Sequence, residues 1–356
     1  MKVIIAGGGT GGHVFPAISV AEEILKRSSA NDVLFVGTKK GLENELLSKR
    51  EYNMRYIRAE GIKGRGLAKG IRAVFSALSG TFDSISLIRE YRPDIVLGVG
   101  GYVSGPMVLA ASLHRIPTAI CEQNAFPGLT NRILGKFSDR VFAAFEESSR
   151  FFPRSKMVVT GNPIREELLT FKGGSSGGDN LTVLIFGGSQ GARTLNSVVP
   201  EVLGRLGRDD ISVIHQTGSA DLESVNTAYK RHGIEARVHA FIEDMAGVYA
   251  EADIVIGRSG AGTVAEITAL GKPSLLIPYP YAANNHQMEN AKILERHGAA
   301  VVIEDKEATA ENMLEALTDA LRKDKLDAMA SRARELGKPE AARAIVDEII
   351  KLTGVN

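Results

Sequence analysis

Short apolar runs alternate along the chain with longer segments of helical periodicity. In the first half the runs are Val3–Ala6, Val33–Val36, Ile95–Val99, Thr118–Cys121 and Val141–Ala144. In the second half they are Leu181–Phe186, Ile211–Gln216, Val238–Phe241, Ile254–Ile256, Ser274–Pro278 and Ala300–Ile303. Short apolar runs bounded by turn residues are typical of buried parallel strands. Their alternation with helical segments predicts βαβ units.

Two of these runs, one in each half, lead into similar glycine loops. Val3–Ala6 is followed by GGGTGG, and Val183–Phe186 is followed by GGSQGA. Glycines let the chain turn sharply and let the backbone approach a ligand before a helix begins. We therefore expect two doubly wound parallel-sheet domains, and a length of 356 residues fits two domains of about 150 residues each. Because such sheets bind at the carboxyl ends of their strands, a shared ligand is expected in the cleft between the domains.

The predicted domain boundary lies in the GNPIR segment at residues 161–165. It separates an N-terminal domain of residues 1–162 from a C-terminal domain of residues 163–340, and the glycine-rich segment 172–180 is expected to be a loop. A final helix over Ala341–Lys351 follows Gly337-Lys338-Pro339. We expect residues 341–356 to cross back and join the first domain.

Composition places the chain among ordinary globular proteins, with 44% hydrophobic and 24% charged residues. A single cysteine, Cys121, excludes an internal disulfide and fits a reducing compartment. No apolar segment approaches the roughly 18 to 20 residues that span a bilayer. We expect a cytoplasmic protein whose membrane association is peripheral.

Charge is unevenly distributed between the two halves. Residues 1–160 carry 22 Lys and Arg against 14 Asp and Glu, whereas residues 161–356 carry 21 against 28. The basic half suggests an anionic partner, and on charge alone nucleic acid and acidic lipid both qualify. Nucleic acid is disfavoured because the chain has no tryptophan and its basic residues are not interleaved with aromatic ones.

The first glycine loop, Gly7–Gly12, is a candidate phosphate site because backbone N–H groups and the helix dipole favour anions at a helix N-terminus. An ordinary turn of a Rossmann-like domain explains the same residues. Neither a P-loop nor a dinucleotide fingerprint is present, which disfavours an NAD-binding oxidoreductase. His13 at the end of the loop suits either a general base or a loop cap.

A second candidate site is GRSGAGTVAE at residues 257–266, directly after an apolar run. The predicted helix N-terminus suits a diphosphate, and Glu266 one turn along suits a ribose diol, because a carboxylate accepts two hydrogen bonds. Glu266 is equally explained as a favourable first-turn acid. The polar segment Asn284–Gln287 suits either sugar hydroxyls or solvent.

Six motifs follow one another along the chain. They are GGGTGGHVFPA at the N-terminus, GGYVSGP at 100–106, EQNAFPGLTNR at 122–132, GNPIR at 161–165, GGSQGA at 187–192 and GRSGAGTVAE at 257–266. In this order they resemble the motifs of the MurG family of bacterial N-acetylglucosaminyltransferases. The resemblance implies a GT-B fold and transfer of GlcNAc from UDP-GlcNAc to lipid I, which yields lipid II for peptidoglycan and so serves cell-wall growth and cell division. It also implies work at the cytoplasmic face of the membrane, beside other cell-wall synthesis proteins.

The resemblance further implies a role for each matching residue. His13 is the implied catalytic base. The implied UDP-GlcNAc contacts are Thr10, Gly11, Gly12, Asn124, Arg165, Ser189, Ile242, Ala261, Gly262, Thr263, Val264, Ala265, Glu266 and Gln287. Of these, Arg165 and Ser189 face the diphosphate, and the main chain at Ile242 and the segment 261–266 frame uracil and ribose. Glu266 lies on the ribose diol and Gln287 on the GlcNAc hydroxyls.

The implied chemistry is a single displacement with inversion. The C4 hydroxyl of MurNAc attacks the anomeric carbon, His13 removes its proton and UDP departs. Helix N-termini and Arg165 stabilise the leaving group. Because the chain contains no Asp-X-Asp motif, we expect no metal and no other cofactor. The alternatives are a related UDP-sugar:diacylglycerol glycosyltransferase and a UDP-GlcNAc epimerase.

One helical segment suggests where the lipid lies. Lys63, Arg65, Lys69 and Arg72 lead into an apolar face made by Ile71, Val74, Phe75, Leu78 and Phe82. Core packing is the ordinary explanation of such a face. With an undecaprenyl acceptor implied, the neighbouring cations favour contact of the 63–82 segment with an anionic membrane.

Overall fold

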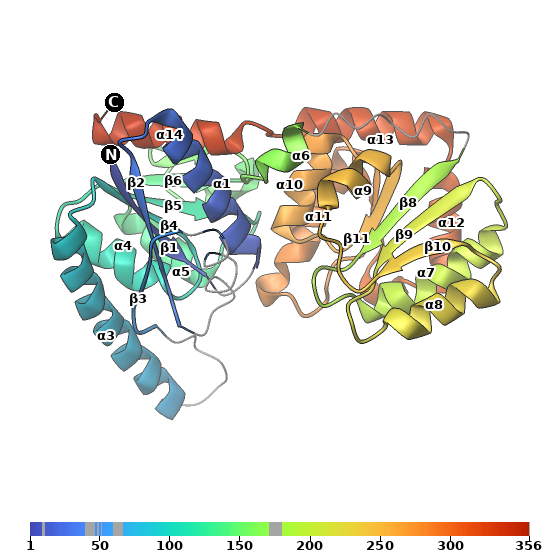
Figure 1. The fold of residues 1–356 in the computed structure, drawn as a ribbon, viewed down its shortest axis with the longest axis horizontal. Helices are drawn as coiled ribbons and strands as arrows, with labels where there is room; N and C mark the ends of the chain where they lie inside the picture. The colour runs from blue at the N-terminus through green and yellow to red at the C-terminus, as the bar shows by residue number, and fades with distance from the viewer. Residues whose placement is uncertain are drawn as a thin grey trace. The chain divides into compact units, whose positions relative to one another are not determined.

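The computed structural model describes residues 1–8, 11–39, 47, 50, 52–59, 67–170 and 180–355, and for residues 67–78 it describes the backbone only. The chain forms two compact units (Figure 1). One comprises Met1–Arg165 with Pro339–Asn356, and the other comprises Glu166–Lys338. The chain therefore passes from the first unit to the second after Arg165, whereas the expected boundary was at residue 162. It returns to the first unit after Lys338.

The first unit is built on a parallel sheet of seven strands in the order β3-β2-β1-β4-β5-β6-β7. The strands are β1 (Lys2–Gly7), β2 (Asp32–Gly37), β3 (Met54–Tyr56), β4 (Ile95–Gly100), β5 (Thr118–Glu122), β6 (Arg140–Ala143) and β7 (Met157–Val159). All five predicted strands are present. The short edge strands β3 and β7 were not among the predicted runs: each has three residues and none of them is buried, so neither forms the longer buried run that predicts a strand.

Helices cover both faces of this sheet. They are α1 (Gly11–Arg27), α3 (Leu67–Tyr91), α4 (Ser104–Leu113), α5 (Leu129–Phe137), the 3-10 helix η1 (Glu146–Arg150) and α14 (Ala341–Thr353). Because side chains alternate along a strand, Val3 and Ile5 of β1 pack with α1 and α14, whereas Ile4 packs on the other face with Met107 of α4. Both faces of the sheet are thus buried.

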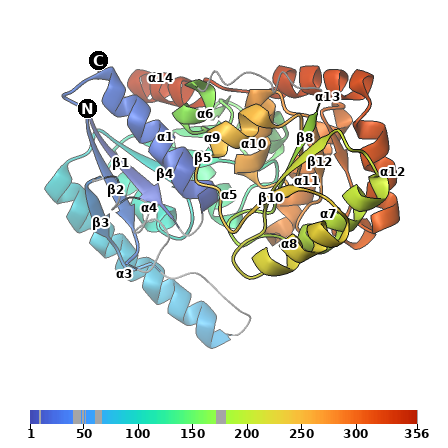
Figure 2. The same ribbon diagram turned by 45° about the vertical axis from the view of Figure 1, so that its right-hand side comes forward.

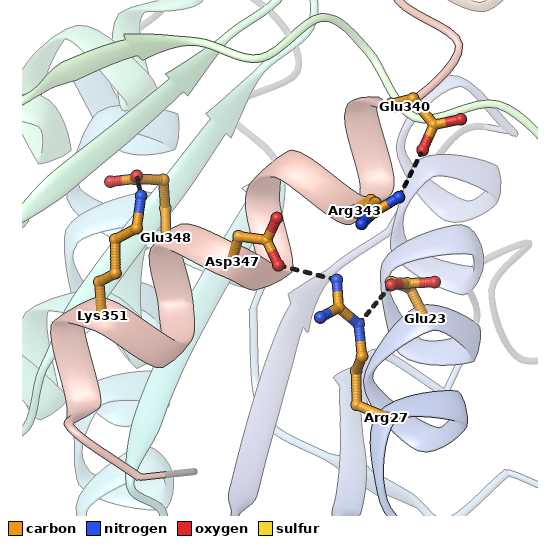
Figure 3. A network of polar contacts seen from close by, with 7 residues as sticks. All are labelled: Glu23, Arg27, Glu340, Arg343, Asp347, Glu348 and Lys351. Carbon is orange, nitrogen blue, oxygen red and sulfur yellow. Dashed lines mark hydrogen bonds and ion pairs between the residues drawn. The ribbon is translucent and has the colours of Figure 1, made fainter.

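The last helix, α14, belongs to the first unit although it follows the second in sequence. Ile345, Val346 and Ile349 are fully buried against the cluster that includes α1, and each such burial stabilises the packing by about 1.5–3 kcal/mol. At its edge, Arg27 of α1 donates to Asp347 at 2.8 Å and to Glu23 at 2.6 Å (Figure 3). The helix is therefore part of the first unit's core.

The second unit has a parallel sheet of six strands in the order β10-β9-β8-β11-β12-β13, flanked by helices (Figure 2). The strands are β8 (Leu181–Phe186), β9 (Ile211–Gln216), β10 (Ala236–His239), β11 (Ile254–Gly257), β12 (Ser274–Leu276) and β13 (Ala300–Val302). The helices are α6 (Glu166–Thr170), α7 (Arg193–Leu206), α8 (Leu222–Arg231), α9 (Met245–Glu251), α10 (Ala261–Leu270), α11 (His286–Arg296), α12 (Ala310–Ala320) and α13 (Lys323–Leu336), with the 3-10 turns η2 (Ala283–Asn285) and η3 (Asp305–Glu307).

All six strands predicted for this unit are present, which confirms the doubly wound fold class. Strand β10 begins two residues earlier than expected, and the residues from Ala240 to Ile242 leave the sheet. Phe241, which made the segment look like a buried strand, is 58% exposed.

Strand order reverses once in each sheet. In the first unit the reversal lies between β1 and β4, and in the second between β8 and β11. Ligands of open parallel sheets bind at the carboxyl ends of strands beside such a reversal, because the flanking loops diverge there. Both glycine loops found in the sequence follow a strand at one of these points. None of the described helices is long and apolar enough to cross a membrane.

Candidate active site

His13 lies in the first turn of α1, at the reversal point of the first sheet. Gly11 and Gly12 are the first two residues of that helix, whereas Thr10 lies outside the described residues. The imidazole packs on Gly100, where a Cβ atom would lie 2.6 Å from both Cε1 and Nδ1. Gly100 also has φ +104°, so only glycine suits this position.

Ser104 holds the β4 loop against the end of β1. Its Oγ donates to the carbonyl of Ala6 at 2.7 Å and accepts the N–H of Gly100 at 3.0 Å. The neighbouring Gly101 lies so close to the carbonyl of Gly8 that no side chain fits there. These contacts explain the GGYVSGP motif, because its glycines and serine shape the surface on which His13 rests.

Asn124 is positioned by a buried acid that the sequence analysis missed. Its N–H donates to Oε1 of Glu122 at 2.9 Å, and Nδ2 of Asn131 donates to Oε2 at 2.8 Å. Burial raises the pKa of Glu122 to about 7, against the opposing effect of these hydrogen bonds. Glu122 is the first residue of the EQNAFPGLTNR motif. The sequence does not distinguish it from a surface acid, because only the folded structure shows that its carboxyl is buried.

Two further contacts place side chains at this edge of the first unit. Nε2 of Gln123 donates to the carbonyl of Val99 at 2.8 Å, which joins the ends of β5 and β4. The guanidinium of Arg165 lies 5.3 Å from the ring centre of Phe15, in the first turns of α1. Arg165 therefore lies near the N-terminal end of α1, a place that suits an anion.

In the second unit the N-terminus of α10 is open. Gly260 caps the helix without a side-chain hydrogen bond, and a Cβ at Gly262 would meet nothing within 4 Å. The N–H groups of the first turn thus have no side-chain cap, and the helix dipole favours an anion. Ala261, Gly262, Thr263, Val264, Ala265 and Glu266 are the first six residues of α10. The side chain of Val264 is buried, so only its main chain can face a ligand.

Glu266 is held by a tyrosine from another helix. The hydroxyl of Tyr249 in α9 donates to Oε2 of Glu266 at 3.0 Å. The Tyr249 ring is 1% exposed and packs edge to face on Phe186 at the end of β8. The carboxylate one turn inside α10 is thereby oriented. Tyr249 was not predicted as a site residue because it lies in a mostly apolar helical segment, where a tyrosine is expected to pack in the core.

Gln287 lies beside the same helix end. Its Oε1 accepts the N–H of Tyr279 at 2.9 Å, and its carbonyl accepts from Oγ of Ser259 at 2.8 Å. Its Nε2 is 4.0 Å from the place of a Cβ on Gly260. The amide group is therefore anchored through its oxygen and directs its nitrogen toward the open end of α10, where it can donate to a ligand.

Arg258 hydrogen-bonds to the loop that follows β12. Its Nη1 donates to the carbonyl of Ile277 at 2.9 Å and to Oδ1 of Asp305 at 2.5 Å. Its side chain is buried, so this pair supports the loop before Gln287 rather than meeting a ligand. Within the described parts of the chain, no group of three or more His, Cys, Asp and Glu side chains is placed to hold a metal ion.

Ser189 and Ile242 lie in the loops after β8 and β10. Ser189 is exposed, as a phosphate contact requires, whereas Ile242 is buried. The N–H of Ile242 donates to Oε1 of Gln216 at 2.8 Å. Gln216 ends the neighbouring strand β9, and the sequence analysis assigned it no role.

Family models and solved structures match both units of the chain. Residues 3–143 match the glycosyltransferase family 28 N-terminal domain, and residues 182–347 match the family 28 C-terminal domain. The UDP-N-acetylglucosamine–N-acetylmuramyl-(pentapeptide) pyrophosphoryl-undecaprenol N-acetylglucosamine transferase of Syntrophus aciditrophicus is 46% identical over 360 residues, which covers 99% of each chain. The crystal structure of Acinetobacter baumannii MurG superposes with a TM-score of 0.83 at 35% identity, covering 98% of this chain and 99% of that one.

A more distant structure shares the fold alone. A putative UDP-N-acetylglucosamine 2-epimerase from Listeria monocytogenes has a TM-score of 0.72 at 19% identity, and the match covers 100% of this chain and 97% of the other. Fold likeness therefore does not separate transferases from epimerases, and the distinction depends on sequence identity.

The two doubly wound parallel-sheet units have the GT-B fold, and the matches of both units to family 28 domains make the chain a glycosyltransferase. The near-full-length identity narrows this class and confirms the resemblance found in the motifs. The chain belongs to glycosyltransferase family 28, within the family of UDP-N-acetylglucosamine–N-acetylmuramyl-(pentapeptide) pyrophosphoryl-undecaprenol N-acetylglucosamine transferases, the MurG family.

Proposed function

We propose that the protein transfers GlcNAc from UDP-GlcNAc to lipid I and so forms lipid II for peptidoglycan synthesis. The observation that carries this proposal is the 46% identity with a transferase of this activity over 99% of both chains. The second unit holds the donor and the first unit holds the lipid acceptor.

The donor contacts follow from the geometry of the second unit. The uncapped N–H groups of α10 and the hydroxyl of Ser189 bind the diphosphate. Glu266 accepts hydrogen bonds from the ribose diol, and the amide nitrogen of Gln287 donates to a GlcNAc hydroxyl. Because Tyr249 and Tyr279 hold these two side chains, both are oriented before the ligand arrives.

The acceptor chemistry falls to the first unit. His13 removes the proton of the MurNAc C4 hydroxyl as that oxygen attacks the anomeric carbon, and the bond to UDP breaks on the opposite face with inversion. Thr10, Gly11, Gly12, Asn124 and Arg165 complete the contacts with the donor. The N-terminus of α10 stabilises the negative charge that develops on the leaving UDP, and the family resemblance assigns the same role to the positive charge of Arg165.

The direct test is incubation of the purified protein with labelled UDP-GlcNAc and a short-chain lipid I analogue in the presence of EDTA. We expect labelled disaccharide lipid. Bound UDP-GlcNAc without labelled lipid would reject the acceptor, and diacylglycerol would then be the next acceptor to try. Loss of labelling in EDTA that magnesium restores would reject metal-independent transfer.

We further propose that the first unit contacts an anionic membrane at the cytoplasmic face. Lys63 and Arg65 of the 63–82 segment lie outside the described residues, and the side chains of Lys69, Ile71, Arg72, Val74, Phe75 and Leu78 are not described. The adjoining surface supports the proposal. On α5, Leu129, Ile133 and Phe137 are each at least half exposed and follow one another at intervals of four residues, so they lie on one helical face.

Further exposed apolar side chains lie on the neighbouring helices. Leu113 at the end of α4 and Phe82 of α3 are 67% and 71% exposed, and α4 packs against both α3 and α5. Two exposed cations, Arg115 and Lys136, lie within two residues of Leu113 and Phe137 in the sequence. We call these residues of α3, α4 and α5 the apolar surface of the first unit. An apolar stripe beside cations is typical of a contact with anionic lipid.

Co-sedimentation with vesicles that contain phosphatidylglycerol tests this surface. Replacement of Leu129, Ile133 and Phe137 by Ser is expected to leave most of the protein in the supernatant. Leu25→Ser is the matched control, because Leu25 is exposed on α1 outside the apolar surface. Unchanged sedimentation of the triple variant would overturn the proposal.

A further inference from the structure

Gln216 joins two segments that the family resemblance assigns to opposite ends of UDP, the diphosphate and the uracil. Its Nε2 donates to the carbonyl of Gly188 at 3.0 Å, in the loop that carries Ser189. Its Oε1 accepts the N–H of Ile242 at 2.8 Å. The first segment follows β8 and the second follows β10, and β9, which ends at Gln216, lies between these strands.

The amide side chain of Gln216 has the hydrogen-bonding groups that this buried position requires. Gln216 is 4% exposed, so its amide group meets protein rather than solvent. An amide offers a donor at one end and an acceptor at the other, and here each end meets a backbone group of the opposite kind. A buried amide without these partners would be strongly unfavourable, which makes the bridge a firm link.

The surrounding backbone leaves little freedom for other arrangements. Gly191 and Gly218 have φ of +74° and +78°, and each lies where an added Cβ would collide with the other loop. The N–H of Gly218 donates to the carbonyl of Ala240 at 3.1 Å. The three loops after β8, β9 and β10 therefore form one connected layer. Gln216 links the loops after β8 and β10 through its side chain.

We propose that Gln216 is a positioning residue for the nucleotide, which sets the spacing between the diphosphate loop and the segment of Ile242 that frames uracil. This inference rests on the proposed function. It follows that UDP, which touches both segments, depends on Gln216 more than UMP, which lacks the second phosphate. It also follows that Gln216 acts on donor binding and not on the chemical step.

Two variants separate this role from a general structural one. Gln216→Met keeps the length of the side chain and removes both hydrogen bonds. Gln216→Glu places a carboxylate oxygen against the carbonyl of Gly188 when ionised, but when protonated it has one O–H donor and one acceptor, as the amide has. The glutamate variant is therefore expected to regain function as the pH falls.

The experiment is isothermal titration of the full chain with UDP and with UMP, together with steady-state kinetics. For Gln216→Met we expect about tenfold weaker UDP binding and an equal rise in KM for UDP-GlcNAc, with kcat unchanged, because two hydrogen bonds are lost. UMP binding should weaken much less. The UDP affinity of Gln216→Glu, taken relative to the unmodified protein at each pH, should rise on acidification.

The outcomes distinguish this inference from the proposed function. Equal weakening of UDP and UMP, or no pH-dependent recovery in Gln216→Glu, would overturn the positioning role while UDP binding by the unmodified protein would leave the proposed function standing. Failure of the unmodified protein to bind UDP would overturn both. Tyr229→Phe is the control, since it removes a buried hydrogen bond to His215 in the same unit and should leave UDP affinity unchanged.

Discussion

Tyr249 donates its phenolic hydrogen to Oε2 of Glu266 across 3.0 Å, from a ring that is 1% exposed. The contact joins α9 to the first turns of α10, so the orientation of one carboxylate depends on a helix that precedes it in sequence. A carboxylate fixed in this way can meet a ribose diol without losing much side-chain freedom on binding.

Tyr249→Phe tests this relationship because it removes one hydroxyl and keeps the packed ring. We expect KM for UDP-GlcNAc to rise about fivefold and kcat to stay nearly constant, since one hydrogen bond that orients a binding group is lost. Tyr229→Phe removes an equally buried hydroxyl that bonds to His215 and serves as the control. A similar rise in KM for both variants would argue against a specific role of Tyr249.

Gly100→Ala is expected to displace the imidazole of His13. The new methyl group would lie 2.6 Å from the ring, at a backbone conformation that alanine rarely adopts. We expect kcat to fall by about a hundredfold, the scale of a 1 Å misplacement of a catalytic group, while UDP affinity stays unchanged. Gly105→Ala is the matched control in the same motif, because its methyl group would make only an ordinary 3.8 Å contact with Thr130. Full activity of Gly100→Ala would contradict the expected clash.

His13→Ala tests the proposed base directly. We expect kcat to fall by about 10²–10⁴, the usual contribution of general-base catalysis, while KM for UDP-GlcNAc changes little. The dependence of kcat on pH should also lose its acidic limb, since the group that must be deprotonated is gone. A variant that keeps both the rate and this limb would show that another group takes the proton.

Glu122 should make the first unit less stable as the pH rises. Its pKa is raised from 4.5 to about 7 by burial, so between these values the folded state binds more protons than the unfolded state. The stabilising contribution is complete below pH 4.5 and is lost as the pH passes 7, by about 3 kcal/mol.

Thermal unfolding of Glu122→Gln at several pH values checks this expectation. The melting temperature of the unmodified protein should fall, relative to that of the variant, as the pH rises from about 5 to about 8. Glu90→Gln, on the exposed surface of the same unit, is the control. A difference that does not change with pH would contradict the assignment.

Local sequence was sufficient for the longer buried strands and for the places of the glycine loops. Every predicted strand is present because a buried parallel strand requires a short apolar run, and such a run can be recognised in the amino-acid sequence. The glycine loops follow β1 and β8 as expected. The motif GRSGAGTVAE spans the last residue of β11, the loop after it and the first turns of α10. The ordered set of six motifs also predicted the family.

Only the tertiary structure could assign roles to Gln216, Tyr249 and Glu122. Gln216 meets Gly188 and Ile242 because β9 lies between β8 and β10 in the sheet, and strand order is not written in any single segment. Tyr249 looks like a core residue until α9 is placed beside α10, and the pKa of Glu122 depends on burial by distant residues. The apolar runs and turn residues predicted the buried strands and the fold class, because these follow from local periodicity and turn chemistry. The partners of the buried polar groups were decided by packing, because each hydrogen bond joins atoms that only the folded chain brings within 3 Å or so of one another.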